Sequence, residues 1–180
     1  MRRVWPWFLP VSMIVILFVV LYNGLYVNPT HIMPSQLLNH TIPRFSARNI
    51  LNEKQLFTSK TFEAHPIALL NIWATWCYAC RIEHATLMRI KHDYHVPIYA
   101  IAYKDDRDTI LQWLLKRGNP YTMVALDQTG DLVIDFGIYG TPETFLIDGS
   151  GTVLYRHVGA LSDSVFLNEM LPIIKRYQKT

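Results

Sequence analysis

The chain has 180 residues, of which 51% are hydrophobic and 17% charged, and its formal net charge is +3. This length fits one domain with an appendage, and two cysteines cannot build a disulfide-rich scaffold or a four-cysteine metal site. The small net charge gives no indication of nucleic-acid binding, and an aromatic share of 13% excludes a disordered chain. The high share of hydrophobic residues is the unusual feature of this composition, and its meaning depends on where these residues lie in the chain.

That excess lies near the N-terminus, where residues 4–27 contain no charged side chain. As a helix this segment would extend roughly 36 Å, enough to cross a hydrocarbon core of about 30 Å. Arg2 and Arg3 precede it and the next Lys or Arg is Arg44, so we expect a cytoplasmic N-terminus and export of the remainder. A cleaved signal peptide would need a small-residue cleavage site, which residues 23–29 do not offer. We therefore predict an uncleaved, single-pass membrane anchor.

The rest of the chain predicts a linker and a folded domain. Residues 28–43 carry three prolines among polar residues, so we assign 1–27 to the cytoplasmic tip and anchor, 28–43 to the linker and 44–180 to the domain. Apolar runs predict strands and helical patterns predict helices, which alternate before a closing hairpin and helix. The expected strands are 67–73, 97–103, 122–126, 143–147 and 153–157, and the expected helices are 78–91, 106–117 and 163–177. This order predicts an α/β sandwich with a mixed central sheet.

Cys77 and Cys80 stand where the first central strand passes into a helix. The unpaired N–H groups and the dipole of a helix N-terminus stabilise a thiolate, which lowers the pKa of a cysteine placed there. With two residues between them, the two sulfurs lie within one helical turn and can form a disulfide. We expect Cys77, at the exposed tip, to attack a partner and Cys80 to resolve the mixed disulfide.

Three other uses of this cysteine pair fit the sequence less well. A structural disulfide over so short a loop would remove little chain entropy. A zinc site would need two further ligands, and the histidines show no paired metal spacing. Haem attachment needs histidine directly after the second cysteine, where this chain has Arg81. We therefore expect a redox-active pair with no metal ion and no other cofactor.

Pro142 precedes an expected central strand, where a proline cannot donate to the sheet and belongs at a strand start or a special turn. In a thioredoxin-like fold, a cis proline at this point faces the cysteine pair. It leaves backbone groups near Thr141 free to pair with an extended partner chain. An ordinary trans turn proline is the alternative, and the preceding strand, cysteine pair and helix favour the cis form. Trp76, next to Cys77, is the expected apolar contact for that partner.

Together these residues resemble the CcmG/DsbE family of membrane-anchored, thioredoxin-like proteins of cytochrome c maturation. The most specific stretches are Gly-Ile-Tyr-Gly-Thr-Pro-Glu-Thr-Phe at 137–145 and Arg-Ile-Glu-His at 81–84. Further matching stretches lie at 69–77, 103–107, 118–121 and 155–157, so that the resemblance spans most of residues 40–180. The dipeptide Tyr78-Ala79 departs from the proline-containing pair of a typical member.

The resemblance implies a thioredoxin-like fold and a periplasmic reductase held at the inner membrane. Such proteins keep the CxxCH cysteines of apocytochrome c, or the cysteines of a haem-lyase partner, reduced for haem attachment. A transmembrane thiol transporter of the DsbD/CcdA kind supplies their electrons. A general periplasmic oxidase or isomerase is an alternative, and so is a module that only holds apocytochrome by backbone pairing.

Two acids are candidates for supporting proton transfer. Thioredoxins proper carry a buried Asp six positions before the first cysteine, where this chain has Asn71. Helical spacing places Glu83 on the same face as Cys80, where burial should raise the pKa of the carboxyl. We expect Glu83 to relay the proton of Cys80, with Glu143 as a second acid; pairing of Glu83 with a cation at the domain edge is the alternative. The charged segment 104–108 reads as a solvated helix start that needs no function.

Overall fold

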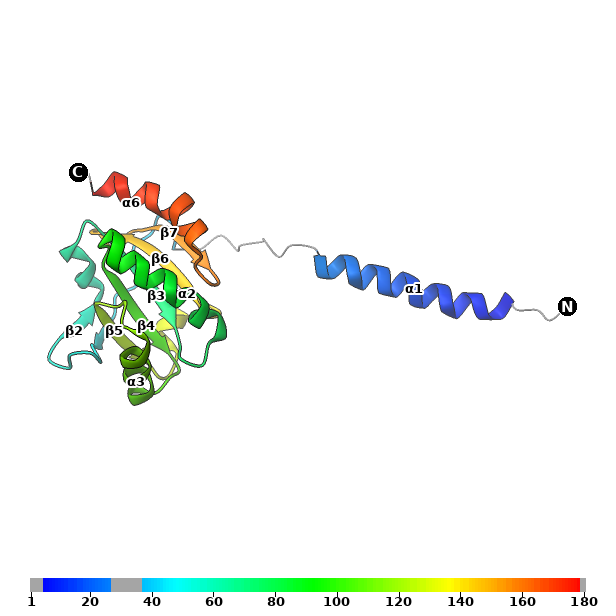
Figure 1. Ribbon diagram of the computed structural model, residues 1–180, viewed down its shortest axis with the longest axis horizontal. Helices are drawn as coiled ribbons and strands as arrows, with labels where there is room; N and C mark the ends of the chain where they lie inside the picture. Colours follow the sequence, from blue (N-terminus) through cyan, green and yellow to red (C-terminus); the bar gives the residue numbers. More distant parts are fainter. Residues whose placement is uncertain (1–4, 27–36, 179–180) are drawn as a thin grey trace. The chain divides into compact units, whose positions relative to one another are not determined.

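The computed structural model describes residues 5–26 and 37–178 and divides into two compact units, Met1–Met33 and Pro34–Thr180. In the first unit, helix α1 (Trp5–Tyr26) has 22 residues (Figure 1). Within the described residues, no helix is long and apolar enough to cross a membrane. The anchor stays a prediction, and its cytoplasmic tip, like most of the expected linker (residues 28–36), lies outside the described residues.

The second unit is built on a five-stranded sheet with the order β5-β4-β3-β6-β7. Strand β3 (Ile67–Trp73) pairs in parallel with β4 (Ile98–Tyr103), which pairs in parallel with β5 (Met123–Asp127). On its other side, β3 pairs antiparallel with β6 (Glu143–Asp148), which pairs antiparallel with β7 (Val153–Val158). The predicted mixed sheet is confirmed, and each strand lies within about one residue of its expected position.

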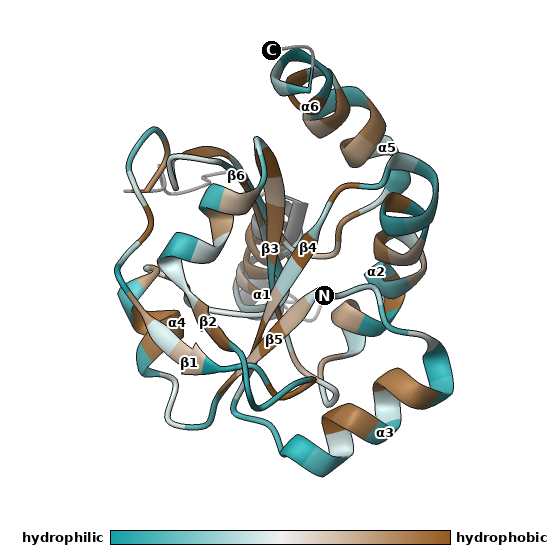
Figure 2. Ribbon diagram, turned by 90° about the vertical axis from the view of Figure 1, so that its left-hand side faces the viewer, coloured by the Kyte–Doolittle hydropathy of each residue, from teal (hydrophilic) through white to brown (hydrophobic). Residues whose placement is uncertain are grey.

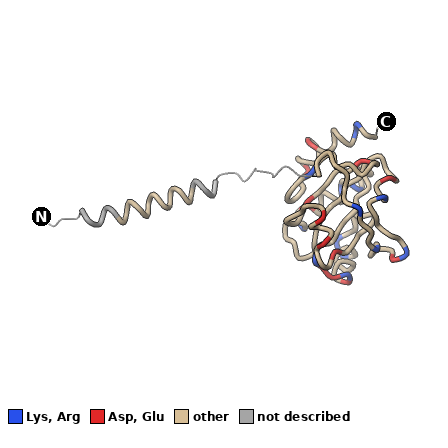
Figure 3. Tube along the Cα trace, turned by 180° about the vertical axis from the view of Figure 1, so that it is seen from behind, with Lys and Arg blue, Asp and Glu red and all other residues tan. Residues whose placement is uncertain are grey.

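Every residue of β3 is buried because both faces of the sheet are covered. Ile67, Leu69 and Trp73 face the helices on one side, while Leu70 and Ile72 belong to a second apolar cluster on the other. Figure 2 shows α2 and α3 on one side of the sheet and α4 with β1 and β2 on the other. Lys and Arg and Asp and Glu residues are distributed along the whole chain trace of this unit (Figure 3).

Three helical segments lie on the first face or close the chain there. Helix α2 (Tyr78–Arg89) continues into a π-helical turn, η2 (Ile90–Tyr94), and α3 (Arg107–Arg117) follows β4. The C-terminal helix comprises α5 (Asp163–Val165), the π-helical η3 (Phe166–Met170) and α6 (Leu171–Tyr177). Pro172 lies in the first turn of α6 and has no N–H to donate, which accounts for the wider turn just before it.

The second face is covered by short elements that the sequence did not predict. They are β1 (Ser46–Arg48), β2 (Leu56–Thr58), the 3₁₀ helix η1 (Ser59–Ala64) and α4 (Asp131–Asp135). Phe57 of β2 is fully buried, stacked on Tyr99 with ring centroids 5.3 Å apart and edge-on to Phe45 at 5.0 Å. The last residues of the expected linker also pack here, since Ile42 is buried and its N–H bonds to the carbonyl of Gly151.

The neighbouring residues Phe57 and Leu56 provide a test of this second face, because Leu56 is exposed. We expect Phe57→Ala to lower the free energy of unfolding by about 3–5 kcal/mol, through lost burial and a residual cavity. The matched variant Leu56→Ala should change it by less than about 0.5 kcal/mol. Urea denaturation of both variants measures the difference, and equal effects would contradict the packing of β2 against the sheet.

Candidate active site

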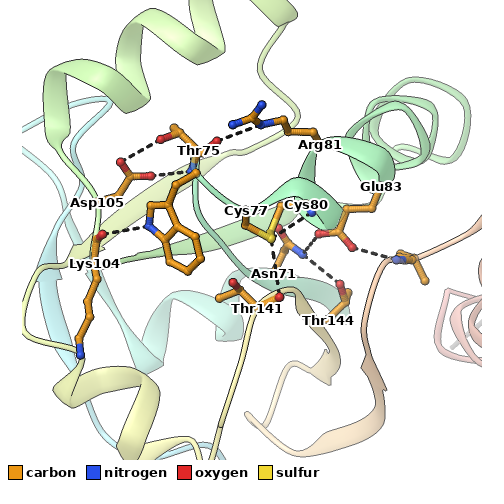
Figure 4. Close-up of a disulfide and its surroundings, with 12 residues drawn as sticks. Asn71, Thr75, Cys77, Cys80, Arg81, Glu83, Lys104, Asp105, Thr141 and Thr144 are labelled. Carbon is orange, nitrogen blue, oxygen red and sulfur yellow. Dashed lines mark hydrogen bonds between the residues drawn. A yellow bond between two sulfur atoms is a disulfide. The ribbon is translucent and has the colours of Figure 1, made fainter. Parts of the chain in front are cut away.

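Cys77 and Cys80 form a disulfide at the start of α2. Cys77 is the N-cap of this helix, and the backbone N–H of Cys80 donates to its sulfur at 3.1 Å. The expectation that Cys77 lies at an exposed tip is wrong in this oxidised form, because Cys77 is 5% exposed and Cys80 3%. The Sγ of Cys77 is covered from the side by the carbonyl oxygen of Thr141, 3.6 Å away (Figure 4).

The segment that covers the disulfide contains the predicted cis proline. The peptide bond between Thr141 and Pro142 is cis, which confirms the prediction for its geometry. The carbonyl of Pro142 accepts a hydrogen bond from the N–H of Gly159, and the carbonyl of Thr141 faces Cys77. The strand–helix junction with the two cysteines and the loop before β6 therefore meet at one place, although they are 64 residues apart in sequence.

Exposed aromatic side chains occur on both of these segments. Trp76 and Tyr78 flank Cys77 and are 55% and 76% exposed, and Tyr139, in the loop before Pro142, is 89% exposed. Large aromatic side chains that remain exposed beside a buried reactive group are typical of a surface that contacts a partner. The position of Trp76 agrees with its expected role, which stays a prediction.

Glu83 lies on the buried face of α2, one turn after Cys80. Its two carboxylate oxygens accept hydrogen bonds from the side-chain amide of Asn71 and from the backbone N–H of Leu161, each at 2.9 Å (Figure 4). Burial raises the pKa of Glu83 to about 7, and the two hydrogen bonds oppose this rise only in part. Among the described residues no cation pairs with Glu83, so the alternative of an ion pair at the domain edge is wrong, and the relay stays a prediction.

Asn71 connects Glu83 to two further buried side chains. Its amide nitrogen also donates to the hydroxyl of Thr144 at 3.0 Å, and its amide oxygen accepts from the phenol of Tyr121 at 3.0 Å. Burial, and then the charge of Glu83, raise the pKa of Tyr121 well above its usual range, so the phenol stays a donor. Because Tyr121 occupies the amide oxygen, the amide nitrogen is directed toward the carboxyl of Glu83.

Glu143 lies at the start of β6, directly after the cis proline, and is buried. Arg156 of β7 binds both of its oxygens, through Nε at 2.7 Å and Nη2 at 3.0 Å, and also donates to the carbonyl of Gly137. Burial raises the pKa of Glu143, and the hydrogen bonds and charge of Arg156 limit that rise. This bidentate pairing favours a role in holding the loop from Gly137 to Pro142, and the role of Glu143 as a second acid stays a prediction.

The sequence did not identify several residues that complete this site. They are Tyr121, Thr144, Arg156, Leu161 and the carboxylate-bound Thr75. All of them except Thr75 reach the site from elements that are distant in sequence, and Thr75 is bound by Asp105, 30 residues further along the chain, so no local spacing indicates these contacts. Four of these residues, Thr75, Tyr121, Thr144 and Arg156, lie in the stretches at 69–77, 118–121, 137–145 and 155–157, whose resemblance to a family was the one available signal.

A cysteine pair at the start of a helix, covered by a cis-proline loop on a mixed sheet, defines a thioredoxin-like thiol–disulfide oxidoreductase. The Redoxin family model matches residues 37–170 of the chain. The chain is 40% identical over 151 residues to the thiol:disulfide interchange protein DsbE of Yersinia pestis, covering 84% of this chain and 79% of that protein. It is 37% identical over 170 residues to DsbE of Pseudomonas fluorescens biotype C, covering 94% and 93%. The chain belongs to the DsbE (CcmG) family of thiol:disulfide interchange proteins.

Solved structures show the same fold. A secreted thiol-disulfide isomerase from Corynebacterium glutamicum superposes with a TM-score of 0.65 at 19% identity, covering 74% of this chain and 85% of that chain. A thio-disulfide isomerase from Thermus thermophilus gives a TM-score of 0.62 at 24% identity, covering 75% and 95%. At these identities the likeness concerns the fold alone, which is thioredoxin-like as expected.

The raised pKa of Glu83 predicts how stability depends on pH. In the folded chain this carboxyl keeps its proton up to about pH 7, whereas in the unfolded chain it ionises near its ordinary pKa of 4.5. The folded state therefore binds more protons between these values, and the free energy of unfolding falls as the pH rises from 4.5 to 7, by about 3 kcal/mol. Glu83→Gln should remove this fall.

Urea denaturation of the oxidised chain at a series of pH values measures the effect. The exposed Glu63 provides a matched control, and Glu63→Gln should keep the wild-type slope. A Glu83→Gln variant with an unchanged slope would show that this carboxyl does not titrate between pH 4.5 and 7.

Proposed function

We propose that this oxidoreductase works as a periplasmic reductase. Its substrates would be the CxxCH cysteines of apocytochrome c or the cysteines of a haem-lyase partner, kept reduced for haem attachment. The observation that carries the proposal is Glu83, a buried carboxyl with a pKa of about 7 that lies one helical turn from the resolving Cys80. The resemblance to the CcmG/DsbE family supports the reductive direction and the choice of partner.

The positions of the two sulfurs define which cysteine acts in each step of the proposed reaction. In the dithiol form, the thiolate of Cys77 attacks one sulfur of the partner disulfide, forms a mixed disulfide and releases the other partner sulfur as a thiolate. The backbone N–H of Cys80, which donates to the Cys77 sulfur in the disulfide, is placed to stabilise that thiolate. Cys80 then attacks the Cys77 sulfur and releases the second partner thiol.

The second step requires that Cys80 lose its proton. Glu83 is the acceptor in our proposal, since a carboxyl that titrates near neutral pH can both take up and return a proton there. Two electrons have then passed to the partner, and the chain is left with the Cys77–Cys80 disulfide seen in the structure. A dithiol donor must reduce this disulfide before the next cycle.

The exposed aromatic side chains around the disulfide suit an extended polypeptide partner. Trp76 and Tyr78, on either side of Cys77 in sequence, and Tyr139, two residues before Thr141, offer exposed apolar contacts. The pair Tyr78-Ala79 replaces the proline-containing pair of a typical family member, and the exposed ring of Tyr78 is a contact that this chain can make. A small contact area of this kind is typical of a transient complex, and such a complex must dissociate after each reduction.

We further propose that residues 4–27 anchor the chain in the inner membrane, with the N-terminus in the cytoplasm and the catalytic domain in the periplasm. The uncharged apolar segment and the position of Arg2 and Arg3 before it support this arrangement. A transmembrane thiol transporter of the DsbD/CcdA kind would then supply the electrons. An anchored domain keeps the cysteine pair near such a donor.

Removing the resolving thiol tests the proposed function. We expect Cys80→Ala to accumulate a mixed disulfide between Cys77 and its partner, because the second step cannot occur. Mass spectrometry of these adducts from intact cells should identify cysteines of CxxCH segments or of a haem-lyase component. Cys77→Ala is the matched control and should form no adduct through Cys80. Adducts dominated by unrelated exported proteins would support a general oxidase or isomerase, and binding without a covalent adduct would support a holding module.

Titrating the thiols tests the role of Glu83. In the reduced wild-type chain, the pH dependence of Cys80 alkylation should contain an inflection near pH 7 from the carboxyl. Glu83→Gln should lose this inflection and slow the resolving step at pH 7 by about 10²-fold. Glu63→Gln should behave as the wild type, and an unchanged Cys80 profile in Glu83→Gln would reject the relay.

A further inference from the structure

The connection between β3 and Cys77 is held in place from outside by the segment that follows β4. Thr75, in this connection, is buried, and each of its polar groups has a side-chain partner. Its N–H and its hydroxyl donate to the two carboxylate oxygens of Asp105 at 2.6 and 3.0 Å, and its carbonyl accepts from Arg81 at 3.1 Å (Figure 4). Hydrogen bonds to charged groups are among the stronger ones, so Thr75 is firmly fixed.

Trp76, the next residue, is fixed by the neighbour of Asp105. Its indole N–H donates to the carbonyl of Lys104 at 3.0 Å, and its ring lies beside Tyr103 with centroids 6.4 Å apart. Trp76 is nevertheless 55% exposed. An exposed tryptophan with a bonded N–H has a defined orientation at the entrance to Cys77.

The backbone of Lys104 adopts an uncommon conformation that makes this contact possible. Its φ of 45° lies in the left-handed region, which residues other than glycine rarely adopt. The Lys104 N–H donates to the carbonyl of Asp127 at 2.8 Å, while its own carbonyl is directed toward Trp76. Gly130 packs against the same residue, because a Cβ there would lie 2.9 Å from Cε of Lys104. An uncommon backbone conformation that several neighbouring groups stabilise, as at Lys104, indicates a functional constraint.

The acids of this segment have separate tasks. Asp106 caps α3 by accepting the N–H of Thr109, and among the described residues the carboxylate of Asp108 pairs only with the neighbouring Arg107. Asp105 is the one whose carboxylate reaches Thr75. The expectation that segment 104–108 is no more than a solvated helix start is therefore wrong for Lys104 and Asp105.

We propose that Lys104 and Asp105 form a positioning element for partner binding. Asp105 fixes the connection before Cys77, and the Lys104 carbonyl orients the Trp76 ring, so that an extended partner chain is aligned with the Cys77 sulfur. Both act through Thr75 and Trp76 and do not touch the reacting sulfurs. A polypeptide disulfide needs this alignment, whereas a small disulfide that reaches Cys77 directly does not. The proposal rests on a partner contact at Trp76 and not on which protein the partner is.

The test compares two substrates in single-turnover oxidation of the reduced full-length chain. One is an oxidised peptide with a disulfide in a Cys-Xaa-Xaa-Cys-His segment, and the other is 5,5′-dithiobis(2-nitrobenzoate). We expect Asp105→Ala to raise the half-saturating peptide concentration about tenfold, with the maximal rate and the rate with the small disulfide changed by less than about twofold. Asp108→Ala, which removes an equal charge from the same segment, should leave both reactions unchanged.

Two further variants test whether Asp105 affects the peptide reaction through Thr75 and Trp76. Asp105→Asn keeps an acceptor oxygen for Thr75 and should restore most of the peptide reaction, and it carries the test if Asp105→Ala does not fold. Trp76→Phe keeps an aromatic ring but lacks the N–H, so adding Asp105→Ala to it should weaken peptide binding by less than in the wild type. Equal losses with both substrates, no loss with the peptide, or the same loss in Asp108→Ala would each overturn the proposal.

Discussion

One buried amide in an otherwise apolar strand connects the polar side chains behind the cysteine pair. Asn71 lies on the face of β3 that packs against α2, where a polar side chain must find partners or lose stability. It finds Glu83, Thr144 and Tyr121, from a helix, a strand and a loop. The carboxyl beneath the disulfide thus comes from the helix that carries the cysteines, while the strand contributes the group that orients it.

Two charged side chains hold the two segments that meet at the disulfide. Asp105 fixes the connection before Cys77, and Arg156 binds Glu143 and the carbonyl of Gly137 on the side of the cis proline. Arg156 lies on strand β7, and Asp105 lies just after the end of strand β4. A reactive group placed on rigid elements and supported by a second layer of hydrogen bonds keeps its geometry between cycles.

The sequence was sufficient for the central fold and for the reactive sulfurs, and it failed where the signal was not local. Seven buried residues in succession made β3 predictable, whereas three-residue strands such as β2 carry too little periodicity to be recognised. The cysteine spacing and Pro142 are local signatures. Tyr121 and Thr144 contact Asn71 across 50 and 73 residues of sequence, and Thr75 is bound by Asp105 across 30, so only the folded chain reveals these contacts.

The near-complete burial of both sulfurs affects which thiols can react quickly with the disulfide. With Cys77 beneath the Thr141 carbonyl, few directions of attack on its sulfur are open to a thiol in solution. Thiol–disulfide exchange requires the attacking sulfur to approach along the S–S axis, so access governs the rate as much as driving force does. A reductant of the disulfide form therefore has to reach the Cys77 sulfur past the Thr141 carbonyl, which restricts the shape of a suitable electron donor.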